Sequence, residues 1–290
     1  MDAICATMIP IAKPVMRSAE IDSVADGCSR AGNGGWLELR SMVAKTVPNR
    51  SDIPAMPDLF PSTHDRAALL DVQRIVASHA CAEDRFNELN GIKTIAGVSQ
   101  AFVCDKIISG IITLDYRTLE EKERTYAIET EDFPYIPTFL AFREGKAIIS
   151  AYGRLPPDER PDLLMFDRCG INHPRFAGLA THIGVLLDIP TIGVTKSILC
   201  GTYRHPAPAN VGDSRPLVYA NREVGWVLKS REGCNPIIVA PGHRVSVNTA
   251  IEIVRHCLRG YRLPEPTRQA HIYANAVKRM YGAKNHTWQR

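Results

Sequence analysis

Side chains suited to phosphate chemistry follow two apolar runs in the middle of the chain. Asp167 comes directly after the run LLMF, His173 lies in the turn that follows, and Lys196 comes just after a second apolar run. Uninterrupted apolar runs of this length are typical of strands buried on both faces. Between them, apolar residues recur at three- and four-residue steps, so 163–194 predicts a strand–helix–strand unit. Such a unit brings the three side chains to one sheet edge, where open α/β sheets bind ligands.

These residue types suit the hydrolysis of a phosphodiester. Carboxylate oxygens are the ligands that Mg²⁺ prefers, and the metal supplies a deprotonated water and stabilises charge on the phosphate. Asp167 and Glu144 are the acids best placed for that role, His173 would orient or protonate, and Lys196 would balance phosphate charge. Each residue taken alone also fits a structural role, such as a turn aspartate or a solvated helical glutamate. Their convergence on one sheet edge favours the functional interpretation.

The composition indicates a globular protein with no membrane segment. The 290 residues are 45% hydrophobic and 23% charged, and the net charge of +4 permits a polyanionic partner without requiring one. No apolar run reaches the ~18 residues of a membrane span, and the acidic Asp2 argues against a secretion signal. The eight cysteines contain no CxxC pair, which is typical of reduced intracellular thiols. We therefore expect a cytoplasmic monomer.

Residues 1–60 differ from the rest of the chain. They contain the sequence GNGG at 32–35 and several prolines without sustained periodicity. We expect a poorly ordered N-terminal extension there. From residue 61 the pattern becomes regular, and 61–290 is expected to form one catalytic domain.

The order of the expected elements predicts the fold class. In chain order they are a helix over 64–80, strands over 94–102, 106–116 and 123–130, a helix from residue 137, the unit of 163–194, strands over 224–228 and 236–239, a helix from 247 and a last helix after 268. Residues 203–217 are expected to form a loop, and residues 241–244 (PGHR) precede the helix from 247. The first three strands predict an antiparallel meander. One mixed sheet flanked by helices is an α/β architecture of the ribonuclease H-like kind.

Five segments resemble the successive signature blocks of the endonuclease V family. They are FPYIPTFLAFRE, PDLLMFDRCGINHPR, THIGVLLDIPTIGVTKS, PGHRVSV and LPEPTRQAHIY. The resemblance implies a ribonuclease H-like repair nuclease that depends on Mg²⁺, with Mn²⁺ as the expected substitute. Such an enzyme recognises deaminated adenine (hypoxanthine, deoxyinosine) in DNA and cuts the second phosphodiester bond on its 3′ side. Some members of the family prefer inosine in RNA instead.

The resemblance also implies two groups of site residues. The catalytic group matches positions around the metal and the scissile phosphate: Asp167, Glu144, His173, Lys196 and His243. The DNA-binding group comprises Tyr135, Gly170, Ile171, Arg175 and Arg268. Tyr135 falls on a wedge that replaces the stacking lost when a base is flipped out of the helix. Gly170 and Ile171 resemble the turn of the lesion pocket.

Three positions depart from the family pattern. Ser99 stands where the family has a third metal-binding acid beside Asp167 and Glu144, and a neutral hydroxyl is a poor ligand for Mg²⁺. Asn248 stands where members carry an acid, in a helical first turn where an acid would also serve the helix dipole. Arg168 replaces the usual glycine, and would either replace part of the metal charge or obstruct the pocket.

These departures leave three hypotheses for the function. The first is an endonuclease that cleaves deaminated DNA with Mg²⁺, and it is the role that the family implies. The second is a protein that binds inosine-containing nucleic acid without efficient cleavage, since a lost metal-site acid lowers the rate on the order of a thousandfold. The third is an inosine-directed ribonuclease, which differs only in its substrate.

Overall fold

The computed structural model describes residues 58–61, 63–86 and 89–287, all within the compact unit Met42–Arg290. The N-terminal extension expected over 1–60 lies outside the described residues, apart from its last three. Among those three, Leu59 and Phe60 are buried, and the Phe60 ring lies 4.8 Å from the His182 ring. The folded part of the chain therefore begins before residue 61.

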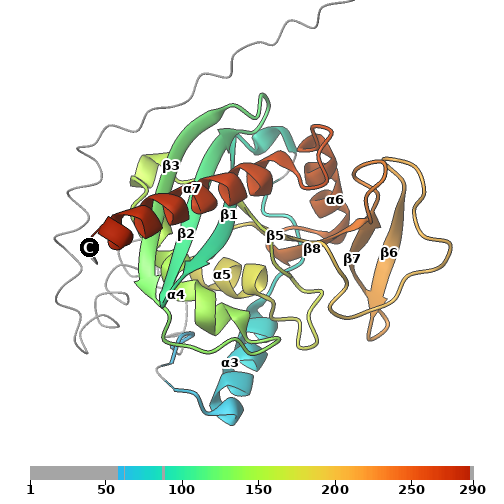
Figure 1. Ribbon diagram of the computed structural model, residues 1–290. Helices are drawn as coiled ribbons and strands as arrows, with labels where there is room; N and C mark the ends of the chain where they lie inside the picture. Colours follow the sequence, from blue (N-terminus) through green and yellow to red (C-terminus); the bar gives the residue numbers. More distant parts are fainter. Residues whose placement is uncertain (1–57, 62, 87–88, 288–290) are drawn as a thin grey trace, which may run out of the picture. The chain divides into compact units, whose positions relative to one another are not determined.

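The described strands form one mixed sheet. They are β1 (Thr94–Val103), β2 (Lys106–Asp115), β3 (Glu121–Thr130), β4 (Leu163–Phe166), β5 (Thr191–Thr195), β6 (Ser214–Tyr219), β7 (Arg222–Leu228) and β8 (Ile237–His243). Their order is β3-β2-β1-β4-β5-β8-β7-β6 (Figure 1). The central strands β1, β4 and β5 run parallel, and the other pairs are antiparallel. The first three strands form the predicted meander.

Helices cover the sheet and confirm the predicted α/β class. They are α3 (Arg66–His79), α4 (Leu140–Gly153), α5 (Leu179–Leu187), α6 (Val247–His256) and α7 (Glu265–Thr287), with short 3₁₀ turns at Leu89–Gly91 and Pro157–Glu159. The long α7 lies across β1 and β2 (Figure 1), whereas α4 packs on β2 and β3, and α5 on β5 and β8. Because β2 contacts both α7 and α4 and is buried along almost its whole length, these helices cover opposite faces of the sheet.

A glycine in β1 determines how closely α7 approaches the sheet. A Cβ atom added at Gly97 would lie 1.8 Å from the carbonyl oxygen of Pro266, in the first turn of α7. Any larger residue would push the helix away from the strand. The absence of a side chain at Gly97 therefore allows the start of α7 to pack directly against β1, two residues before Ser99.

The structure differs from the sequence-based expectations at two proline-containing segments. The last four residues of the expected loop 203–217 belong to β6, an edge strand in which Pro216 is tolerated. The strand expected over 236–239 extends further, as β8, to His243, with Pro241 beside an irregularity in the pairing of β5 with β8. Edge strands and bulges accommodate proline, which explains why both segments form strands.

Two further expectations concern the described residues as a whole. None of the helices within them is long and apolar enough to cross a membrane. The described cysteines are all free thiols, and only Cys257 among them is fully buried.

Candidate active site

Parallel pairing of β1 with β4 places Ser99 beside Asp167. Val98 pairs with Phe166, so the next residue of each chain segment lies at the carboxyl end of β4. The Ser99 hydroxyl donates a hydrogen bond to Oδ2 of Asp167 at 2.9 Å, and its Oγ lies 3.4 Å from Nδ1 of His271 on α7. Sequence reasoning did not select His271, although it lies in the block LPEPTRQAHIY. Only the position of α7 over β1 reveals this contact.

Arg168 connects the two predicted catalytic acids. Its Nε and Nη2 donate to Oε2 and Oε1 of Glu144 at 2.9 and 3.1 Å. Its Nη1 donates to the Asp167 carbonyl oxygen at 3.0 Å and lies 3.2 Å from Oδ1 of the same residue. Glu144 projects from the buried face of α4 and is 1% exposed. The guanidinium therefore occupies the space between two carboxylates, and its two-point pair with Glu144 is among the strongest hydrogen-bonded arrangements.

Opposing effects act on the pKa values of this pair. Burial raises the pKa of Glu144, and the charge and hydrogen bonds of Arg168 offset part of this increase. Burial also disfavours the charged form of Arg168, but Asp167 and Glu144 outweigh it and raise the pKa of the guanidinium. The raised pKa of Glu144 favours the neutral acid, whereas the raised pKa of Arg168 favours a charged ion pair. The geometry supports the charged pair, because two N–H groups of an always protonated guanidinium point at both carboxylate oxygens.

The donor groups present do not fit Mg²⁺. Both oxygens of Glu144 accept hydrogen bonds from Arg168, and Oδ2 of Asp167 accepts one from Ser99. Mg²⁺ requires several oxygen ligands in near-octahedral geometry, and the neutral Ser99 replaces a carboxylate that would provide one. Within the described part of the chain, no three or more His, Cys, Asp or Glu side chains are grouped so as to hold a metal ion. A guanidinium stands where a metal would have to bind these acids.

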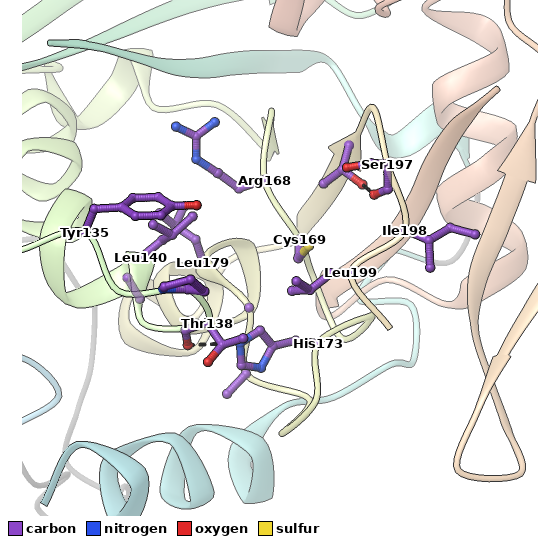
Figure 2. Close-up of a pocket in the computed structure, with 15 residues that line it drawn as sticks. Tyr135, Thr138, Leu140, Arg168, Cys169, His173, Leu179, Ser197, Ile198 and Leu199 are labelled. Carbon is purple, nitrogen blue, oxygen red and sulfur yellow. Dashed lines mark hydrogen bonds between the residues drawn. The ribbon is translucent and has the colours of Figure 1, made fainter. Parts of the chain in front are cut away.

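A cavity of about 200 Å³ lies beside this ion pair (Figure 2). Its lining comes from the loop before α4, the turn after β4, the start of α5 and the loop after β5: Tyr135, Pro137, Thr138, Leu140, Ala141, Arg168, Cys169, His173, Ala177, Gly178, Leu179, Thr195, Ser197, Ile198 and Leu199. Tyr135 lies at the rim and is 63% exposed. The guanidinium of Arg143 lies 5.5 Å from its ring centroid, in cation–π contact.

His173 and Arg175 support the loop that carries this tyrosine. The buried His173 accepts a hydrogen bond from the Arg175 backbone N–H on Nδ1 at 3.3 Å, so its Nε2 carries the hydrogen and donates to the Thr138 carbonyl oxygen at 3.0 Å. Arg175 Nη2 donates to the same oxygen at 3.1 Å, and its guanidinium lies 4.9 Å from the Phe139 ring. Both ring nitrogens of His173 are thus engaged by the backbone. His173 and Arg175 therefore hold the backbone of Thr138, which forms part of the cavity wall.

Gly170 and Ile171 form a turn packed against β8. A Cβ atom at Gly170 would lie 2.1 Å from the carbonyl oxygen of Pro241, and the Ile171 N–H donates to that oxygen at 2.8 Å. Gly170 is itself buried, and the neighbouring Cys169 faces the cavity. The turn therefore shapes the cavity through its backbone.

Lys196 and Arg268 lie near the predicted site. Lys196 is exposed and stands between the cavity-lining residues Thr195 and Ser197, at the same sheet edge as Asp167. Arg268 lies one helical turn before His271 on α7, where it forms an ion pair with Glu265 and stacks over Tyr261 at 4.3 Å.

The structure does not bring His243 to this group. His243 pairs with Thr191 at the start of β5, whereas Asp167 follows the end of β4, and β4 and β5 are parallel. His243 therefore lies towards the opposite end of these strands. Its Nε2 lies 3.2 Å from Oδ1 of Asp188, and its Nδ1 accepts a hydrogen bond from the Cys81 N–H at 3.2 Å. The sequence block PGHR gave no indication of which sheet edge it reaches.

Asn248 lies on the same side as His243, in the first turn of α6. It is exposed, and the helix start beside it is bound by Asp84, which accepts from the Ser246 N–H at 2.7 Å and from the Thr249 hydroxyl at 2.8 Å. An acid at this position would interact with the helix dipole. The structure therefore favours the structural interpretation of Asn248.

Two buried histidines predict loss of stability in mild acid. Burial lowers the pKa values of His173 and His182 to about 4. Because these values lie below the ~6.5 of an unfolded histidine, stability is complete above pH ~6.5 and falls as the pH drops towards 4, by up to about 3 kcal/mol per residue. Urea unfolding measured between pH 7 and 4.5 tests this. The variant His173→Gln should reduce the slope, whereas His79→Gln, at an exposed position, should not. An equal slope in all three proteins would contradict the assignment.

A mixed sheet with acids gathered where its central parallel strands end defines the class of ribonuclease H-like nucleases. The sequence model of the endonuclease V family matches residues 74–272. The endonuclease V of Protochlamydia amoebophila is 41% identical over 228 residues, which cover 78% of this chain and 95% of that protein. The chain belongs to the endonuclease V family. This is a family of repair nucleases that are typically Mg²⁺-dependent.

Solved structures of the family agree with the fold. The crystal structure of the Streptomyces avermitilis endonuclease V has a TM-score of 0.70 and 32% identity, and the match covers 78% of this chain and 98% of that one. A Ciona intestinalis endonuclease V, in complex with a 24mer DNA containing an inosine followed by a ribo-adenosine, has a TM-score of 0.67 and 22% identity, covering 74% and 98% of the two chains. The ribonuclease H-like fold is therefore confirmed.

Proposed function

We propose that this protein recognises hypoxanthine in DNA by receiving the flipped base in the cavity beside Tyr135. The observation that supports the proposal is the position of this side chain, 63% exposed at the rim of a cavity of about 200 Å³. Such a cavity is smaller than the ~300–1,000 Å³ that drug-sized ligands occupy, which suits a single base. An exposed aromatic ring at its rim suits the gap that a flipped base leaves in the stack.

The surroundings of the cavity suit a nucleic acid backbone. The exposed Lys196 lies beside it and provides positive charge where a strand would enter, whereas Arg143 beside the Tyr135 ring is already paired with Glu131. Ser197 lies on the opposite side of the cavity from Tyr135 (Figure 2), and Thr195 is a second polar residue of the lining. Hypoxanthine presents a carbonyl and a ring N–H where adenine presents an amino group and a bare nitrogen. A wall with fixed polar groups discriminates between these two patterns. The Ciona relative bound to inosine-containing DNA supports this choice of ligand.

A second candidate function is cleavage of the second phosphodiester bond on the 3′ side of the lesion. It is favoured by Asp167, Glu144 and Lys196, which lie around the same sheet edge as the cavity. The ion pairs of Arg168 and the hydroxyl of Ser99 oppose it, because they engage both oxygens of Glu144 and Oδ2 of Asp167. We therefore place recognition first and expect cleavage to be weak. Inosine-containing RNA is the alternative ligand, and it is compared directly in the assay below.

Removing the Tyr135 ring is expected to abolish the preference for the lesion. In fluorescence anisotropy with matched duplexes, Tyr135→Ala should lose affinity for the deoxyinosine duplex by about 10- to 100-fold, since stacking on one base contributes about 1–3 kcal/mol. Affinity for the undamaged duplex should hardly change. Tyr135→Phe keeps the ring and should retain the preference.

Val211→Ala provides a matched control, because Val211 is also exposed but lies in the loop before β6, outside the cavity lining. If Tyr135→Ala keeps the same preference for deoxyinosine as this control, the proposed role of Tyr135 is wrong. Tighter binding of single-stranded inosine RNA than of the deoxyinosine duplex would assign the cavity to RNA instead.

A further inference from the structure

We infer that Arg168 is a built-in cation that replaces the divalent metal ion between Glu144 and Asp167, so that this site neither binds nor needs Mg²⁺. The inference concerns the ion pair alone. It does not depend on which nucleic acid the cavity receives.

Arg168 contacts both Glu144 and Asp167, as a metal ion bound between them would. Three of its five N–H groups are used, two by Glu144 and one by the carbonyl oxygen of Asp167. The Glu144 side chain is 2% exposed and that of Arg168 is 23% exposed. A metal ion would have to displace a two-point pair from a largely dry position, and would then leave the guanidinium without its partners.

The net charge of the site also supports the replacement of the metal ion by Arg168. Three carboxylates around one Mg²⁺, the set that the resemblance to the family implies, would give a net charge of about −1 at neutral pH. Here Glu144, Asp167 and Arg168 also give −1, because one acid is missing and the cation is monovalent. The loss of an acid at Ser99 and the gain of Arg168 therefore compensate each other.

Ser99 fits this arrangement better than an acid would. It is fully buried, and its hydroxyl donates to Oδ2 of Asp167, the carboxylate oxygen that Arg168 does not face. An aspartate at this position would bring a third negative charge beside Asp167 and Glu144, and Arg168 is the cation that contacts these two acids. The two departures from the family pattern thus belong to one change in the site.

The two N–H groups of Arg168 that remain have a use in binding nucleic acid. The side chain lines the cavity and lies on the same side of it as Tyr135 (Figure 2). A phosphate oxygen of a bound strand can accept from a guanidinium that is partly exposed, as arginine is well suited to phosphate. Arg168 would then supply to the strand the positive charge that the metal supplies in other members.

Metal binding tests the inference without any measurement of activity. Mn²⁺ is titrated into the unchanged protein and into Ser99→Asp, Arg168→Gly and the double variant, with free Mn²⁺ followed by electron paramagnetic resonance. The unchanged protein should bind none at this site, and the double variant should bind at least one ion per chain. The melting temperature gives a second readout: Mg²⁺ should raise it by several degrees in the double variant only.

The unchanged protein alone is sufficient to overturn the inference. Stoichiometric Mn²⁺ binding by it, reversed by Mg²⁺ and lost in Asp167→Asn, would show that Arg168 gives way to a metal. A double variant that folds, as judged by circular dichroism, and still binds no Mn²⁺ would equally contradict the proposed exchange. If this double variant does not fold, Ser99→Asp/Arg168→Gln, which also removes the positive charge but keeps N–H donors, should acquire Mn²⁺ binding, and failure to do so would count against the inference.

Discussion

The double variant Ser99→Asp/Arg168→Gly is expected to cleave deoxyinosine-containing DNA in Mg²⁺ at least about a thousandfold faster than the unchanged protein. The reason is that both obstacles to a metal site are removed together. The aspartate adds a third carboxylate next to Asp167, and the glycine frees both oxygens of Glu144. Single-turnover cleavage of a labelled duplex, with the nick mapped on a sequencing gel, measures the rate.

Each single variant is a control for this prediction. Ser99→Asp alone should gain little, because Arg168 still holds Glu144 and would also pair with the new acid. Arg168→Gly alone leaves the site one carboxylate short. Equal rates in the double variant and the unchanged protein would mean that these two positions do not limit cleavage. A full gain from Ser99→Asp alone would mean that Arg168 is no obstacle.

Arg168→Ala is expected to reduce the free energy of unfolding by about 3–5 kcal/mol, since removing one partner of a buried ion pair leaves an uncompensated charge. Glu144 is 1% exposed and would lose both of its hydrogen-bond donors from Arg168. Urea denaturation at pH 7 in EDTA measures the loss. At lower pH the loss should shrink, because the raised pKa of Glu144 allows the acid to take up a proton.

Arg74→Ala is the matched control for this measurement. Arg74 also pairs with a carboxylate, Asp71, but the two side chains are 72% and 63% exposed. An exposed pair of this kind contributes only about 0–1 kcal/mol. If Arg168→Ala destabilises the protein no more than Arg74→Ala, the pair with Glu144 is not the buried structural contact described above.

The sequence predicted the parts of the site that depend on strand order. Asp167 and Lys196 follow two apolar runs, and parallel pairing of those runs is enough to bring both to one edge. The role of His271 was beyond reach, because its contact with Ser99 depends on how closely α7 approaches β1 at Gly97. Helix packing distances of this kind are not visible in a periodic pattern.

Arg168 and His243 are two further residues whose contacts could not be predicted from the sequence. Arg168 was identified as a departure next to Asp167, but its two hydrogen bonds to Glu144 depend on the placement of α4 against β4. His243 was predicted to be catalytic from a matching sequence block. Its segment extends β8 past the strand expected over 236–239, so that it pairs with Thr191 at the start of β5, far along the strands from Asp167.

The affinity of the unchanged protein for a deoxyinosine duplex, measured with Mg²⁺ and with EDTA at constant ionic strength, tests the central claim most directly. If Arg168 supplies the positive charge of the site, the dissociation constant should be the same in both buffers, and the preference over an adenine duplex should persist. The duplex recovered from the Mg²⁺ sample should be almost entirely intact. Binding that requires Mg²⁺, together with rapid nicking at the second phosphodiester bond on the 3′ side, would contradict the account.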